Sequence, residues 1–159
     1  MGDARPAVVV IGVGNELRGD DGAGIEVARA LRALVDPSEV LVLEQHGEAL
    51  GLIDQWDGFP AAIIIDAIGA GEPAGALRRI DASREPVPAE LRSSTSTHAV
   101  GVGETIELAR AVDRLPRTVL VHGVQGASFD TGSPISAAVR AAIAPLAERV
   151  RSEAAALCG

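Results

Sequence analysis

The sequence predicts one three-layer α/β domain over residues 1–159, with a twisted, largely parallel sheet of about five strands and helices on both faces. Three observations predict this architecture. Four short, β-branched apolar runs are typical of strands that are buried on both sides. Segments with helical periodicity alternate with these runs, as they do in parallel sheets. The length of 159 residues corresponds to about one domain.

The predicted strands are apolar runs bounded by residues that break regular structure. They are Ala7–Val13, Val40–Leu43, Ala61–Ile65 and Thr118–Val124, with Ala76–Ile80 as an added edge strand. Sheets of this kind bind their ligands beyond the carboxyl ends of the strands. We therefore expect the functional side chains at that edge of the sheet.

The predicted helices lie between the strands and carry apolar residues at three- and four-residue spacing. They are Ala23–Val35, Ala49–Trp56, Gly103–Val112 and Ser136–Leu157. For the last of these, Ser133 followed by Pro134 indicates an N-cap and a first helical position. Asp81–Thr97 is predicted to be a loop, and a connection this long in a compact domain is often functional.

Composition excludes several classes of function. All 14 basic residues are arginines, which excludes a P-loop lysine, a Schiff-base lysine and a lysine general base. Aromatic residues make up only 2% and the net charge is −8, so we expect neither nucleic acid nor a membrane as partner. A single cysteine, Cys158, and an N-terminus without a signal-peptide pattern predict a cytoplasmic protein.

The segment GVGNELRGDDGAG, residues 12–24, allows three interpretations. Gly12 and Gly14 fit a dinucleotide fingerprint, but Leu17 stands at its third glycine, and Asp20 and Asp21 would repel a phosphate at the helix N-terminus. One or both aspartates can instead project at the sheet edge as acid/base groups or hard metal ligands. In the purely structural alternative, one aspartate caps the following helix and the other is solvated.

Further candidate residues follow the other strands. Asp66 ends the third strand, where it can serve chemistry or hydrogen-bond its own loop. His98 lies in the polar loop and His46 ends the second strand, whereas His122 inside a buried strand is predicted to be a core histidine. If the strand ends and the loop converge, Asp21, Asp66 and His98 form a set that suits Ni, Co, Fe, Mn or Zn.

Four motifs, taken together, resemble the hydrogenase maturation protease family. GVGNELRGDDGAG, IIIDAIGAGEPAG, STSTHAVG and VHGVQGASFDTGSPISAAV occur in the order and spacing of that family and cover most of the chain. The resemblance implies a single α/β domain. It also implies an aspartic-type endopeptidase that removes the C-terminal peptide of a nickel–iron (NiFe) hydrogenase large-subunit precursor after nickel insertion. Nickel, supplied by the substrate, would be the recognition signal, and no nucleotide cofactor is expected.

Carried over by motif, the catalytic and metal-contacting residues are Asp21, Asp66 and His98. The partner is expected to be the large-subunit precursor, and the protein is expected to be a monomer. One position departs from the family in residue type: members of the family often have Glu where this sequence has Asp21. Another departure is Gln45-His46-Gly47, which replaces a glycine-rich segment and leaves open whether His46 adds a ligand.

The mechanism also keeps alternatives at this level. The sequence has no convincing Ser/His/Asp or Cys/His arrangement, so hydrolysis would use water activated by a carboxylate, by nickel or by both. One aspartate or a nickel-bound water would deliver the attack, and Gln125 is a candidate for substrate docking. Two other functions use the same segments: a nonproteolytic nickel-binding carrier and a nucleotide-binding α/β module.

Overall fold

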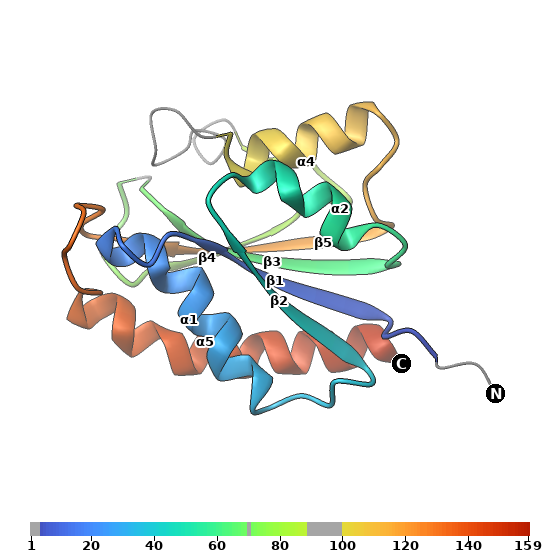
Figure 1. Ribbon diagram of the computed structural model, residues 1–159, viewed down its shortest axis with the longest axis horizontal. Helices are drawn as coiled ribbons and strands as arrows, with labels where there is room; N and C mark the ends of the chain where they lie inside the picture. The colour runs from blue at the N-terminus through green and yellow to red at the C-terminus, as the bar shows by residue number, and fades with distance from the viewer. Residues whose placement is uncertain (1–3, 70, 89–99) are drawn as a thin grey trace.

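The computed structural model, which describes residues 4–69, 71–88 and 100–159, contains a five-stranded sheet of order β2-β1-β3-β5-β4 (Figure 1). Four strands are parallel, and the fifth, β4, pairs antiparallel with β5 at one edge. The strands are β1 (Val8–Gly14), β2 (Val40–His46), β3 (Ala61–Ile68), β4 (Leu77–Asp81) and β5 (Thr118–Gln125). The predicted fold class, including the added edge strand, is confirmed.

Helices cover both faces of the sheet, as predicted. In Figure 1, α1 (Ala23–Arg32) and α5 (Ala137–Cys158) lie against one face, and α2 (Leu52–Trp56) and α4 (Val102–Ala111) lie against the other. Two short 3-10 turns, η1 (Gly19–Gly22) and η2 (Ala49–Gly51), precede α1 and α2. None of the helices in the described ranges is long and apolar enough to cross a membrane.

Each face of the sheet has its own aliphatic core. Alternation along β1 directs Val8 and Val10 toward α1 and α5, and Val9 and Ile11 toward the α2 and α4 face. All four side chains are completely buried, which explains why this strand is an uninterrupted apolar run. Because β1 and β3 are neighbouring interior strands, the segments after them leave the sheet side by side at its carboxyl edge.

Glycine allows α1 to pack unusually close to the sheet. A Cβ at Gly24 would lie 2.4 Å from the carbonyl oxygen of Ile65 and 2.5 Å from that of Val13. A Cβ at Gly12 would lie 2.2 Å from the carbonyl oxygen of Gly24. These two glycines therefore serve the close packing of α1 on the sheet rather than the binding of a phosphate.

Two of the differences between predicted and observed element boundaries bear on the site. β3 continues to Ile68 because its ladder with β5 runs on through Ile68 and Gln125, so Asp66 lies within the strand rather than at its end. α5 begins at Ala137, with Ser136 as N-cap, rather than at Pro134. The reason is that the backbone N–H and the hydroxyl of Ser136 both donate to the carboxylate of Asp20, which fixes the chain there.

Candidate active site

Asp66 lies near the carboxyl end of β3, beside Gly123 of β5. The backbone N–H of Ala67 donates to its Oδ1 at 2.9 Å. Its carboxyl also borders a hollow of about 20 Å³, otherwise lined by Gly103, Gly123 and apolar side chains. The apolar members are Ile68, Ile80, Val87, Val102, Ile106 and Val121. Among the described residues, Asp66 thus has mostly apolar neighbours and one side-chain hydrogen bond, from Ala67.

This environment changes the acidity of Asp66. Burial, and after it the negative charge of Asp21, raise the pKa of Asp66 from an ordinary 3.8 to about 8. The hydrogen bond from Ala67 acts in the opposite direction but is the smallest cause. At neutral pH the Asp66 carboxyl therefore keeps a proton in the absence of a cation. A strongly perturbed carboxyl at a sheet edge is a marker of a functional site.

Asp21 reaches the same edge from η1, which folds back over the end of β1. The backbone N–H of Asn15 donates to the Asp21 carbonyl oxygen at 3.2 Å, and that oxygen would lie only 2.0 Å from a Cβ at Gly14. The Asp21 side chain is 11% exposed and lies 3.8 Å from the guanidinium of Arg18. Asp21 lies near enough to Asp66 for its negative charge to raise the pKa of Asp66, and their joint role in one site stays a prediction.

Asp20 has a different role from its neighbour. Its carboxylate is fully buried and accepts hydrogen bonds from the backbone N–H groups of Ala127 and Ser136, both at 2.7 Å, from that of Ser128, and from the Ser136 hydroxyl. Burial opposes its ionisation, but these hydrogen bonds outweigh burial and lower the pKa of Asp20. Asp20 therefore fastens the segment after β5 to η1.

The structural alternative for the acidic pair is wrong in both parts, because neither aspartate caps α1 and both are buried rather than solvated. The N-cap of α1 is Gly22, and no side chain caps that helix. Because Asp20 is committed to the segment at 127–136, the residue of the pair that is left for chemistry is Asp21. His98, the third predicted member, lies outside the described residues and stays a prediction.

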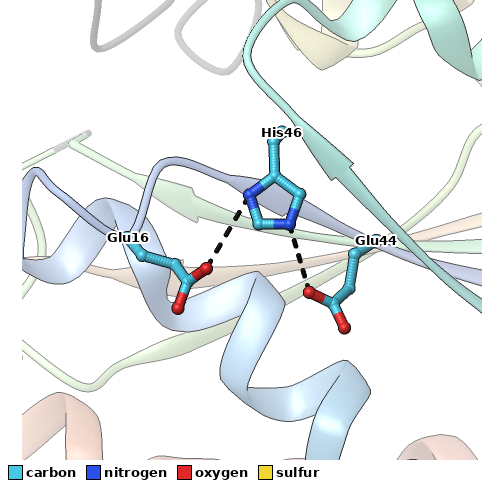
Figure 2. Close-up of side chains that lie close together, drawn as sticks. All are labelled: Glu16, Glu44 and His46. Carbon is cyan, nitrogen blue, oxygen red and sulfur yellow. Dashed lines mark hydrogen bonds and ion pairs between the residues drawn. The ribbon is translucent and has the colours of Figure 1, made fainter.

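His46 ends β2, as predicted, but it contacts other residues. Its Nε2 lies 3.1 Å from Glu44 and its Nδ1 lies 3.8 Å from Glu16, as Figure 2 shows. β1 separates β2 from β3, so His46 is two strands, or about 10 Å, from the line of Asp66. His46 therefore belongs to a neighbouring cluster with Glu16 and Glu44 and is not placed as an added ligand of the Asp21–Asp66 pair.

Glu16, Glu44 and His46 have donor atoms within 4.8 Å of one another, a spacing that can hold a metal ion. Two arginines of α1 already neutralise the carboxylates. Arg29 donates to both oxygens of Glu16 and to Glu44, and Arg32 donates to Glu44 at 2.5 Å. Although burial acts against ionisation, these contacts lower the pKa of Glu44 to about 2. The cluster is an ion-pair network that ties the β1–α1 loop to β2 and α1.

His122 is a core histidine, as predicted, although it also has a polar partner. It is 1% exposed, and its Nε2 lies 2.7 Å from Glu153 of α5, which in turn accepts a hydrogen bond from Arg79 of β4 at 2.8 Å. Glu153 was not predicted, because a glutamate on a helix with many polar residues gives no sequence signal. Gln125 is 4% exposed and donates to the Gly126 carbonyl oxygen.

Among the described residues, the candidate site thus consists of two carboxyl groups at the carboxyl edge of a parallel sheet, and the pKa of one of them, Asp66, is raised to about 8. Such a pair offers hard oxygen ligands to a cation and a base whose pKa is close to neutrality. Fold and site together define a single-domain α/β protein with a paired-aspartate centre. Comparisons with known proteins place this class more narrowly.

A family model for hydrogenase maturation proteases matches residues 25–153, and the chain belongs to that family. The chain is 30% identical over 145 residues to the hydrogenase expression/formation protein HoxM of Cupriavidus necator, covering 89% of this chain and 71% of that protein. It is 27% identical over 144 residues to the hydrogenase 2 maturation protease of Escherichia coli, covering 90% and 87%. It spans 65% of the length of the related HupD protein of Thiocapsa roseopersicina, to which it is 30% identical.

Solved structures support the fold independently. The solution structure of an endopeptidase from Escherichia coli matches with a TM-score of 0.77 at 24% identity, covering 90% of this chain and 88% of that one. The crystal structure of the hydrogenase maturation protease HycI from Thermococcus kodakarensis matches with a TM-score of 0.73 at 24% identity, covering 94% and 91%. The single α/β architecture is therefore shared along nearly the whole chain.

Proposed function

We propose that this chain is an endopeptidase that removes the C-terminal peptide of a nickel–iron hydrogenase large-subunit precursor after nickel insertion, and that it recognises the nickel of that substrate. The observation that carries the proposal is the Asp21–Asp66 pair, in which burial and a like charge raise the pKa of Asp66 to about 8. Membership of the hydrogenase maturation protease family supports the choice of substrate.

The chemistry of the pair fits a divalent cation carried by the substrate. A carboxyl whose ionised form is destabilised by a neighbouring negative charge gains stability when a cation approaches both groups. Carboxylate oxygens from Asp21 and Asp66, with an imidazole from His98, form a donor set that accepts nickel. Three protein ligands leave room for the groups that already hold the ion in the precursor. Bound there, the nickel would orient the precursor at the site.

Peptide hydrolysis then requires a base and a route for one proton. Asp66 is the candidate for the base, because the approach of the cation would displace its proton and leave a carboxylate that can accept one from water. Its carboxylate accepts a proton from a water molecule while the water oxygen bonds to the carbonyl carbon of the scissile peptide. The carbon–nitrogen bond breaks, and the proton passes to the departing amine. Positioning by Asp21 and His98 brings the scissile bond within reach of Asp66.

A cleavage assay tests the proposal. Purified nickel-loaded precursor is incubated with the protein, and loss of the C-terminal peptide is followed by mass spectrometry. We expect Asp21→Asn, Asp66→Asn and His98→Ala each to slow cleavage by about a hundredfold or more. Asp54→Asn, which changes an exposed aspartate of α2, is the matched control and should cleave at the wild-type rate. An Asp66→Asn variant with full activity contradicts the proposal.

Two further measurements separate nickel recognition from nickel transport. Precursor without nickel should be cut at least about tenfold more slowly than loaded precursor, because it lacks the ion that would bind to Asp21 and Asp66. Equal rates would reject nickel recognition. Equilibrium dialysis with free nickel should give weak binding, whereas tight binding together with no cleavage would identify a nonproteolytic carrier instead.

A further inference from the structure

Leu17 is an apolar side chain held out in solvent beside the candidate site. It is 72% exposed, the highest value among the exposed large hydrophobic residues of the described ranges. It belongs to the loop between β1 and η1, four residues before Asp21. Single exposed leucines are common on protein surfaces, so exposure alone assigns no role. The backbone around Leu17 and its place in the fold distinguish it.

The loop holds Leu17 in one position by its backbone. The N–H of Leu17 donates to the side-chain oxygen of Asn15 at 2.9 Å, and its carbonyl oxygen accepts from the N–H of Gly132 at 2.8 Å. Gly132 lies in the segment that Asp20 fastens to η1. The side chain of Leu17 takes no part in these hydrogen bonds, so they fix the position of its backbone without depending on the side chain.

The residues on either side are fixed by ion pairs. Glu16 is held by both nitrogens of Arg29 and lies beside His46 (Figure 2), and Arg18 pairs with Asp21. The neighbouring charges are thus engaged within the chain, and Leu17 is the apolar point between them. An exposed apolar side chain on a backbone that is held in place, with polar groups around it, is a suitable arrangement for an interface anchor.

We infer that Leu17 is a docking contact for the protein substrate and inserts into an apolar recess on the precursor surface next to the segment that is cut. This inference rests on the proposed function, because it takes the precursor as the partner. The direction is set by position: Leu17 and Asp21 lie in one short segment at the carboxyl edge of the sheet. A protein that brings its scissile segment to Asp21 and Asp66 must therefore approach over Leu17.

The test compares Leu17→Ser with two matched controls, Leu34→Ser and Leu108→Ser. Leu34 is 39% exposed and follows the end of α1, and Leu108 is 46% exposed and lies in α4. Neither belongs to the loop after β1. Cleavage of nickel-loaded precursor is measured over a range of precursor concentrations. We expect Leu17→Ser to lower kcat/KM by about tenfold to fiftyfold, mainly through a higher KM, since burial of a leucine contributes equally to ground and transition state. Both controls should stay within about twofold of wild type. Leu17→Met, which keeps an apolar side chain of similar size, should retain most of the wild-type kcat/KM.

Other outcomes overturn the inference. A Leu17→Ser variant with unchanged KM shows that the side chain makes no substrate contact. A lower thermal midpoint for Leu17→Ser than for the controls shows a role in the fold instead. If size-exclusion chromatography with light scattering finds a wild-type dimer that Leu17→Ser dissociates, the occupant is a second copy of this chain.

A binding arm keeps this inference distinguishable from the proposed function. Biolayer interferometry measures capture of nickel-loaded precursor by wild type and by Leu17→Ser, independently of cleavage. If wild type captures the precursor without cutting it, the proposed activity fails, and a weaker capture by Leu17→Ser still supports the docking contact. Equal capture by both proteins overturns the docking contact even when cleavage is observed.

Discussion

Replacement of Asp66 by asparagine should change how the stability of the protein depends on pH. Asparagine keeps an oxygen that can accept the hydrogen bond from Ala67 and has nearly the same shape, but it cannot ionise. Because the pKa of Asp66 is raised on folding, the folded state binds its proton more tightly than the unfolded chain does. The contribution of Asp66 to the free energy of unfolding must therefore fall as pH rises.

The magnitude is set by the two pKa values. A rise from 3.8 to about 8 corresponds to about 6 kcal/mol, at about 1.4 kcal/mol per pH unit. Near pH 4 and below, the folded and unfolded states are both protonated at Asp66, so wild type and Asp66→Asn should have similar stability. Between about pH 4 and pH 8 the wild type loses stability relative to the variant, and above pH 8 the difference levels off.

Urea denaturation at several pH values between 4.5 and 9, with a chelator present to exclude metal ions, measures this difference. Asp66→Asn should be the more stable protein at pH 8.5, by several kcal/mol, and Asp54→Asn should follow the wild-type curve. In Asp21→Asn the decline in stability should end at a lower pH than in the wild type. This variant removes the like charge, which lowers the folded-state pKa of Asp66, but leaves the burial of Asp66 in place. Parallel curves for wild type and Asp66→Asn would refute the reasoning.

Three further changes test how the site is held in place. Asp20→Ala leaves buried donors of the segment at 127–136 unpaired and should cost about 3 kcal/mol in urea denaturation at pH 7. Since the pKa of Asp20 is lowered on folding, this cost should shrink as pH falls below about 4, and a constant cost would contradict the assignment. Glu153→Ala removes the partner of buried His122 and should lower the free energy of unfolding by about 2 kcal/mol. The cleavage rate, measured below the thermal midpoint, should stay at the wild-type value. A selective loss of activity would contradict a purely structural role. Gly24→Ala should lower the thermal midpoint by more than about 10 °C or prevent folding, because its Cβ meets two backbone oxygens, and a variant of normal stability would show that α1 can move away from the sheet.

The strands were predictable because their local pattern is decisive. Buried parallel strands need unbroken β-branched runs, and β1 and β5 show such runs almost from end to end. Their exact ends were less predictable. β2 continues through Glu44 to His46, and β3 continues past Asp66, because neighbouring strands still offer hydrogen-bond partners there. Polar residues at a strand end look like loop residues when only the sequence is considered.

The roles of Asp20 and Asp21 show where sequence reasoning ends. Two adjacent aspartates are chemically equivalent in a sequence, and both can serve as a ligand, a base or a cap. The distinction comes from Ala127 and Ser136, more than 100 residues away, whose backbone N–H groups reach Asp20 alone. The same is true of His122 and Glu153, which meet only because α5 lies across β5.

By itself the sequence determined the aliphatic parallel sheet and the exclusion of lysine chemistry, because these depend on residue types and on local periodicity. It also predicted the carboxyl edge of the sheet as the place of chemistry. The tertiary structure decided which aspartate serves the fold, and it decided that Asp66 keeps its proton near neutral pH. Both depend on burial and on charges brought together from distant parts of the chain. A carboxyl has an ordinary acidity in water, and only the packing around Asp66 and the approach of Asp21 change it.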